Sequence, residues 1–174
     1  MNKRLFIVGC FFLTSCFSNN NYQVSRISSY ENQIKPILSG NGKQLAFIID
    51  DNGDKKIRLI HIASGRRLPL RHISRHEPYS APSLSWNGRY LAIISKFQGQ
   101  RIALIEDLLA GIVYKLPLNF QDLPENISLT PDASKVVIQF GSDAASSLRF
   151  LDLTNKLTKD FSHELKDSKS LSNN

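Results

Sequence analysis

Cysteine is scarce in this chain of 174 residues, which contains only Cys10 and Cys16. Because no cysteine follows residue 16, the rest of the chain cannot form a disulfide or a thiolate metal site. Long hydrophobic runs are absent as well. The apolar stretch at residues 5–13 holds nine residues, whereas a membrane-spanning helix needs about 20. The overall composition, 41% hydrophobic and 21% charged, is that of a globular protein with one ordinary core.

Motifs for catalysis and metal binding are also missing. The sequence has no nucleophile elbow, no phosphate-binding loop and no zinc motif of two histidines around a glutamate. His72 and His76 are four residues apart, but they fall in an expected connector that ends at Pro78, which favours a solvated loop over a metal site. The acidic residues at 50–54 surround an Asn-Gly pair without the glutamate of a calcium loop, so a hairpin turn is favoured. We therefore predict no catalytic residue, no metal and no cofactor, and do not expect an enzyme.

The amino terminus has the pattern of a secretion signal. Lys3 and Arg4 precede the apolar stretch, and Leu13-Thr14-Ser15-Cys16 closes it. This closing segment resembles the lipobox of bacterial lipoproteins, in which the peptide is cut before the cysteine and the sulfur carries a diacylglycerol. The resemblance implies a signal peptide over residues 1–15 and a lipidated Cys16 at the head of a polar tether, residues 16–21. A cut before Cys10 would leave only five apolar residues, so Cys16 is preferred; a buried N-terminal helix is the alternative.

Three segments of the chain repeat one another. They read ILSGNGKQLAFII at residues 37–49, SLSWNGRYLAIIS at 83–95 and SLTPDASKVVIQF at 128–140. Gly42 and Gly88 are 46 residues apart, and Ala133 holds the equivalent place 45 residues later. A period in the mid-forties, with a short turn before an apolar strand, is typical of the four-stranded blades of a β-propeller.

Each repeat has the residues that such a blade requires. The pairs Asn41-Gly42 and Asn87-Gly88 predict type I′ hairpin turns. The following strands, 45–49 and 91–94, are apolar at every position, so we expect both of their faces to be covered. Second strands are predicted at 57–62, 102–105 and 148–153, and outer strands, each with a proline suited to a sheet edge, at 66–70 and 113–118.

These repeats resemble those of the TolB propeller family, whose consensus is serine-proline-aspartate-glycine-lysine before an apolar strand. Ser39-Gly40-Asn41-Gly42-Lys43 and Ser85-Trp86-Asn87-Gly88-Arg89 match at serine, glycine and the basic residue, whereas Thr130-Pro131-Asp132-Ala133-Ser134 keeps proline and aspartate. The resemblance implies an all-β domain of three four-stranded antiparallel blades, a partial TolB/WD40-like β-propeller or half of a six-bladed ring, over residues 22–160. A polar tail, residues 161–174, follows. The TolB-type ring has six blades and an extra N-terminal domain, so no functional residue is carried over.

Three blades do not close a ring, which leaves sheet faces and edges open. A homodimer that completes six blades is one solution, and capping by the terminal segments is another. Residues 22–27 alternate like an edge strand and are a candidate for completing a blade. A decayed fragment of a longer gene is the third alternative.

Charge and signal together define the expected setting. The chain carries +7, and removing the signal leaves 20 basic against 15 acidic side chains. The excess gathers at Arg66, Arg67, Arg71 and Arg75, which suits either an anionic partner or a solubilised sheet edge. We expect a lipoprotein anchored through its lipid in a membrane and facing the periplasm, with the outer membrane favoured because Phe17, not aspartate, follows the cysteine.

The expected function is a non-enzymatic scaffold or protein-binding module of the cell envelope, related to the Tol–Pal system through the TolB resemblance. An envelope protein is the expected partner, and nucleic acid is not. The alternative is a glycan- or peptidoglycan-binding protein in which Trp86, Tyr90 and Tyr79 stack on sugars.

Overall fold

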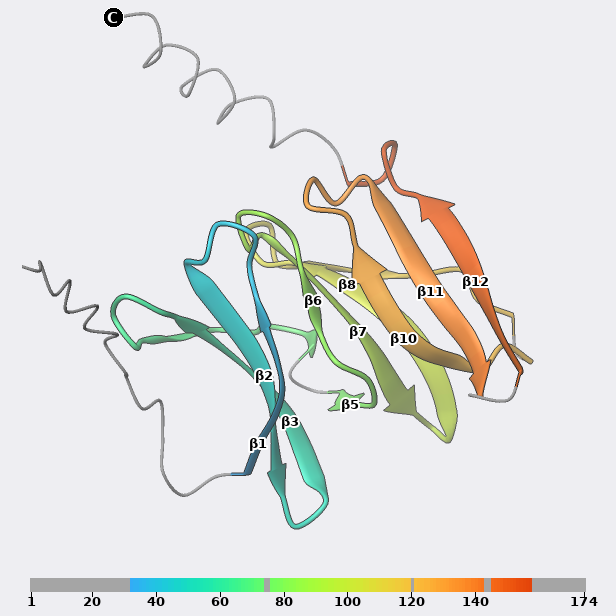
Figure 1. Ribbon diagram of the computed structural model, residues 1–174, viewed down its shortest axis with the longest axis horizontal. Coiled ribbons are helices and arrows are strands. Elements are labelled where there is room, and N and C mark those ends of the chain that lie inside the picture. Colours follow the sequence, from blue (N-terminus) through green and yellow to red (C-terminus); the bar gives the residue numbers. More distant parts are fainter. Residues whose placement is uncertain (1–31, 74–75, 120, 143–144, 158–174) are drawn as a thin grey trace, which may run out of the picture.

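The computed structural model describes residues 32–73, 76–119, 121–142 and 145–157, and these residues form three antiparallel β-sheets (Figure 1). The sheets stand one after another along the chain, as blades of an open arc. No helix among the described residues is long and apolar enough to cross a membrane. The predicted all-β partial propeller is therefore confirmed. The predicted signal, the tether, residues 22–27 and the polar tail lie outside the described residues.

The strands divide into three blades, which are named here in chain order. Blade 1 is the sheet β1-β2-β3-β4, formed by β1 (Asn32–Leu38), β2 (Gln44–Asp51), β3 (Asp54–His61) and β4 (Arg67–Leu68). Blade 2 contains β5 (Glu77–Pro78), β6 (Ser83–Leu84), β7 (Tyr90–Phe97), β8 (Gln100–Asp107) and β9 (Ile112–Lys115). Blade 3 is the sheet β10-β11-β12, formed by β10 (Pro124–Leu129), β11 (Lys135–Ser142) and β12 (Ala145–Asp152).

The innermost strand of blade 2 is interrupted. Both β5 and β6 pair with the same strand, β7, at Pro78↔Ser95 and Ser83↔Ala92. Pro78 and Pro82 lack the N–H that a continuous ladder would need. Blade 2 is thus a four-stranded blade whose first strand is split in two.

The core confirms that the all-apolar strands are covered on both faces. Leu91 and Ile93 of β7 pack into the cluster between blades 1 and 2, and Ala92 and Ile94 into the cluster between blades 2 and 3. All four side chains are completely buried. Since side chains alternate across a strand, a blade between two neighbours must be apolar at every position.

The predicted type I′ turns are wrong in position. In the turns at residues 39–43 and 85–89 only the glycines, Gly42 and Gly88, have positive φ, at 68° and 76°. Positive φ at both central residues occurs instead in the two-residue β2–β3 and β7–β8 hairpins, at Asn52-Gly53 and Gln98-Gly99.

The three repeat turns use side-chain hydrogen bonds in place of I′ geometry. The hydroxyl at the first position of each turn accepts the backbone N–H of the residue five positions later, at 2.9 Å for Ser39, 3.0 Å for Ser85 and 3.0 Å for Thr130. The side-chain oxygen of the Asn or Asp at the third position (Asn41, Asn87 or Asp132) accepts the backbone N–H of the residue at the fifth position. This distance is 3.0 Å in every turn. This pattern explains why Ser/Thr and Asn/Asp recur in the repeats.

The outer strands are shorter than predicted, because β4 covers only 67–68 and β9 only 112–115. Pro69 and Pro117, predicted within edge strands, follow them instead, since proline cannot donate to the ladder. Blade 3 has three strands among the described residues, and none of these residues forms a strand against the outer edge of β12.

Candidate functional site

The repeat turns also join the blades to one another. The Asn41 N–H donates to the Trp86 carbonyl at 2.9 Å, and the Trp86 N–H donates to the Pro131 carbonyl at 2.7 Å. The Trp86 ring packs on Gly40, where an added Cβ would lie 2.3 Å from the indole. These contacts hold the three blades in a fixed order at one rim of the arc.

The basic connector between blades 1 and 2 is held by a buried carboxylate. Glu106 is completely buried, and its oxygens accept the N–H groups of Arg71, His72 and Ile73 at 3.0, 3.2 and 2.9 Å. The role of Glu106 could not be predicted from the sequence, because its place at the end of an apolar strand resembles that of any surface acid. The structure therefore shows a fixed connector that presents Arg71 and His72 to solvent.

The other candidate residues of the sequence do not assemble into a metal site. His72 is exposed, while His76 is half-buried against Phe97 at a ring-centre distance of 5.7 Å. Within the described residues no group of three metal-binding side chains occurs. Arg75 lies outside the described residues, and so does the proposed lipidation site, Cys16, which remains a prediction.

The three aromatic residues considered for sugar stacking do not share a surface. Trp86 is exposed at the rim, but Tyr90 is 5% exposed and belongs to the core between blades 2 and 3. Tyr79 is covered by the Arg101 guanidinium, 3.9 Å from its ring centre, and donates its hydroxyl to Glu125 at 3.0 Å. Burial, followed by the hydrogen bond to Glu125, raises the pKa of Tyr79. A stacking platform made of these three rings is therefore not present.

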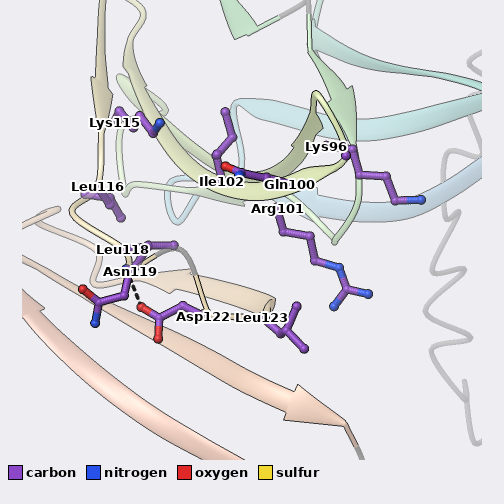
Figure 2. A pocket seen from close by; sticks show the side chains of 11 residues that line it. Lys96, Gln100, Arg101, Ile102, Lys115, Leu116, Leu118, Asn119, Asp122 and Leu123 are labelled. Carbon is purple, nitrogen blue, oxygen red and sulfur yellow. Dashed lines mark hydrogen bonds between the residues drawn. The ribbon is translucent and has the colours of Figure 1, made fainter.

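A cleft of about 440 Å³ opens at the seam between blades 2 and 3 (Figure 2). We call it the seam cleft. One side consists of Lys96 and residues 99–102, and the other consists of Lys115 and the connector residues that follow it. Ile102 and Leu116 are buried, whereas Leu123 is exposed, so the walls include apolar surface that water reaches.

The charges around the seam cleft are only partly balanced. Asp122 is held by Arg149 of β12 through two hydrogen bonds of 2.7 and 2.6 Å, and it accepts the Asn119 N–H at 2.7 Å. The contact with Arg149, above all, lowers the pKa of Asp122. Arg101 is paired with Glu125. Lys96 and Lys115 form no ion pair with another described residue. The Lys96 ammonium lies over the Tyr79 ring, 5.3 Å from its centre, and Lys115, which pairs with Leu104, lies on the face of blade 2 turned toward blade 1.

The end of the arc at blade 3 presents a second candidate surface. Leu148 and Phe150 of β12 are 62% and 71% exposed, and they lie on the face turned away from blade 2. The alternate residues of β11, Val136, Ile138 and Phe140, are buried in the core with blade 2. One face of blade 3 is therefore core, and the other carries large apolar side chains in solvent. This outward face and the free edge of β12 are called the β12 surface.

Comparison with known proteins agrees with this geometry at the level of fold. No protein-family model and no curated protein matches the sequence. Among solved structures, TolB from Acinetobacter baumannii has 18% identity and a TM-score of 0.59, covering 76% of this chain and 32% of that chain. The putative TolB from Agrobacterium tumefaciens has 16% identity and a TM-score of 0.60, covering 73% and 48%. The propeller domain of the Trilobed protease from Pyrococcus furiosus has 15% identity and a TM-score of 0.52, covering 72% and 40%.

The sheets and these similarities define the class of the protein as a β-propeller. Its particular form is a partial propeller of three TolB-type blades. The chain spans between 32% and 48% of the length of these propeller structures, so it corresponds to part of a ring.

Proposed function

We propose that the protein is a lipid-anchored, non-enzymatic binding module of the bacterial envelope, and that its β12 surface receives an envelope protein. The single observation that carries the proposal is the exposure of Leu148 and Phe150 beside a strand edge without a partner strand among the described residues. A long apolar edge strand invites pairing with another chain unless charge or proline protects it. β12 has no proline, and its one cation, Arg149, is already engaged by Asp122.

The setting in the envelope is supported by the chain's own amino terminus. The basic start, the short apolar run and Leu13-Thr14-Ser15-Cys16 match a lipoprotein signal, and the blades resemble those of TolB, the periplasmic component of the Tol–Pal system. A lipid on Cys16 would keep the blades next to a membrane, where a partner in the same compartment is always near. The outer membrane is favoured by Phe17.

Protein recognition at β12 combines two kinds of contact. The free edge offers alternating N–H and C=O groups, to which an extended segment of a partner can add as the next strand. The exposed side chains of Leu148 and Phe150 supply apolar contact area, and aromatic residues often contribute most to such interfaces. A second copy of the chain is the other conceivable occupant, and the experiment below distinguishes the two.

The test compares the size and composition of the complex in envelopes dissolved with mild detergent. The full chain should migrate with a second protein in a complex larger than one copy. Replacing both Leu148 and Phe150 by serine should release the chain as a single copy. The matched control, Leu109→Ser, removes a side chain that is 72% exposed on blade 2 and should leave the complex intact. A complex that survives the double replacement, or that contains only this chain, would refute the proposal.

A further inference from the structure

The outer margin of blades 1 and 2 is formed by β4, by β9 and by the connector that leaves β4. Residues 55–73 hold six lysines and arginines without an aspartate or glutamate, and residues 108–121, which include the β8–β9 turn and β9, also lack acids. The two acids at the end of β8, Glu106 and Asp107, are only 0% and 3% exposed. Glu106 is engaged by the connector, and Asp107 accepts three hydrogen bonds from Arg89. The surface of this margin is therefore positive.

The arginines of the margin are turned to solvent by the packing of their neighbours. Leu68 and Leu70 are half-buried in the core between blades 1 and 2, while Arg67 and Arg71 on either side of them are exposed. Arg66 is exposed as well. Within the described residues, these three arginines form no ion pair and lie over no aromatic ring. Their guanidinium groups are thus available to an anion.

The connector is fixed in place, so its cations are preorganised. Glu106 accepts the N–H groups of residues 71–73. The Arg71 side chain lies against the β8–β9 turn, since a Cβ added to Gly111 would be 2.9 Å from one of its guanidinium nitrogens. Arg71 is thereby held at blade 2, and Arg67 is held on blade 1 by the pairing of β4 with β3. A fixed set of cations loses less conformational freedom on binding than a mobile one.

Exposed apolar side chains lie beside these cations. In and after the turn that Arg71 contacts, Leu109 is 72% exposed and Ile112 is 48% exposed. Arginines next to exposed apolar side chains suit the interface of a membrane, where anionic headgroups lie directly above hydrocarbon. A soluble anion would meet the arginines but would leave the apolar side chains in water.

We infer that this margin of blades 1 and 2 lies on the surface of a bilayer that contains anionic lipids. The guanidinium groups of Arg66, Arg67 and Arg71 pair with lipid phosphates, which they recognise through charge-assisted hydrogen bonds. Leu109 and Ile112 enter the boundary between the headgroups and the acyl chains. These five residues are called the basic margin.

The inference rests on the proposed function in one respect, because a lipid on Cys16 is what would keep the basic margin near a membrane. Without that lipid, three arginines hold the chain only weakly at physiological ionic strength, where exposed charges are screened. The contact therefore orients the anchored blades. It leaves the β12 surface free for a partner, since β12 belongs to the blade at the other end of the arc (Figure 1).

The test measures co-sedimentation of the full-length Cys16→Ser chain, which cannot carry the lipid, with vesicles at low ionic strength. Vesicles of phosphatidylglycerol and phosphatidylcholine should bind it at least about tenfold more tightly than vesicles of phosphatidylcholine alone. Replacing Arg66 and Arg67 together by glutamine should weaken this binding about 25-fold, because each arginine contributes about fivefold near an anionic surface. The matched control, Lys135→Gln with Lys156→Gln, removes the same charge from exposed positions after β10 and β12 and should have a much smaller effect.

A second variant tests the apolar part of the basic margin. Leu109→Ser keeps the charge and should weaken binding about threefold or more, because its side chain no longer leaves water on binding. The amino-terminal segment is the same in every variant, so the differences between variants report on the basic margin. Neither variant depends on the lipid at Cys16 or on β12, so this inference and the proposed function can fail separately.

Four results would overturn the inference. Equal binding to both kinds of vesicle would exclude recognition of anionic lipid. An equal loss in the arginine variant and the lysine control would mean that only net charge matters. Unchanged binding of Leu109→Ser would remove the apolar contact that distinguishes a bilayer from a soluble anion. Poly-glutamate that binds more tightly than the anionic vesicles, and depends on the same arginines, would assign the basic margin to an acidic protein.

Discussion

Replacing Glu106 by glutamine should destabilise the protein by about 2–4 kcal/mol. One carboxylate oxygen accepts the N–H groups of Arg71 and His72, and the other accepts the N–H of Ile73. A glutamine carbonyl can keep the first two bonds, but its NH₂ group then faces the third donor. A buried donor without an acceptor costs about 1–3 kcal/mol. The two remaining bonds lose their charge assistance, which makes them roughly half as strong, while relief from burying a charge offsets part of the loss.

The assay is urea unfolding of the full chain, followed by the fluorescence of its single tryptophan, Trp86. Trp86 lies at the turn that joins the blades, so its emission should report separation of blade 2 from its neighbours. Glu77→Gln, which changes an exposed glutamate on β5, is the control and should alter the free energy of unfolding very little. A loss below about 1 kcal/mol for the Glu106 variant would refute the reasoning, since it would mean that the connector does not depend on this carboxylate.

Three further predictions follow from the sequence and the turns. Cys16→Ser should abolish incorporation of labelled fatty acid and release the chain from membranes, whereas Cys10→Ser should not; equal labelling of both variants would exclude Cys16. Gly40→Ala should destabilise the fold by about 1–3 kcal/mol, because its Cβ would lie 2.3 Å from the indole, whereas Gly42→Ala, whose Cβ meets no atom within 4 Å, should cost only about 1–2 kcal/mol of backbone strain at its positive φ; a Gly40→Ala protein as stable as the unchanged protein in urea would contradict this. Hydrogen bonds, above all the one from the Thr130 hydroxyl, lower the pKa of Asp132 in the folded state. The ionised carboxylate therefore stabilises the fold, and this contribution is lost as the pH falls below the unfolded-state pKa of about 3.9. Acid unfolding of Asp132→Asn should therefore lack this contribution, and identical acid dependence in both proteins would contradict it.

The parts of the fold that could be predicted from sequence are those with a local cause. The repeat period, the two-faced apolar strands and the order of hairpins depend on spacing and side-chain type, so they were predicted and are observed in β2 and β7. The I′ geometry was assigned to the wrong turns because an Asn-Gly pair favours positive φ at both residues. At residues 41–42 the serine hydroxyl and the asparagine side chain stabilise a different loop.

The candidate sites have causes that the sequence does not display. Glu106 contacts the N–H groups of residues more than 30 positions earlier, which no local pattern predicts. The seam cleft arises because β9 ends at Lys115, opposite Leu104, and so pairs with only the second half of β8; strand ends are poorly specified by composition. The exposure of Leu148 and Phe150 follows from the absence of a described neighbour beside blade 3, whereas their alternation alone resembles that of a buried strand.

The central claim is that the β12 surface is an interface with another envelope protein. The most direct measurement places a photo-crosslinking amino acid at position 148 in cells that make the full chain, with the same replacement at position 109 as the control. The account predicts a discrete adduct at position 148, absent at 109, whose mass spectrum contains a second protein. No adduct at 148, the same adduct at both positions, or an adduct made of two copies of this chain would contradict it.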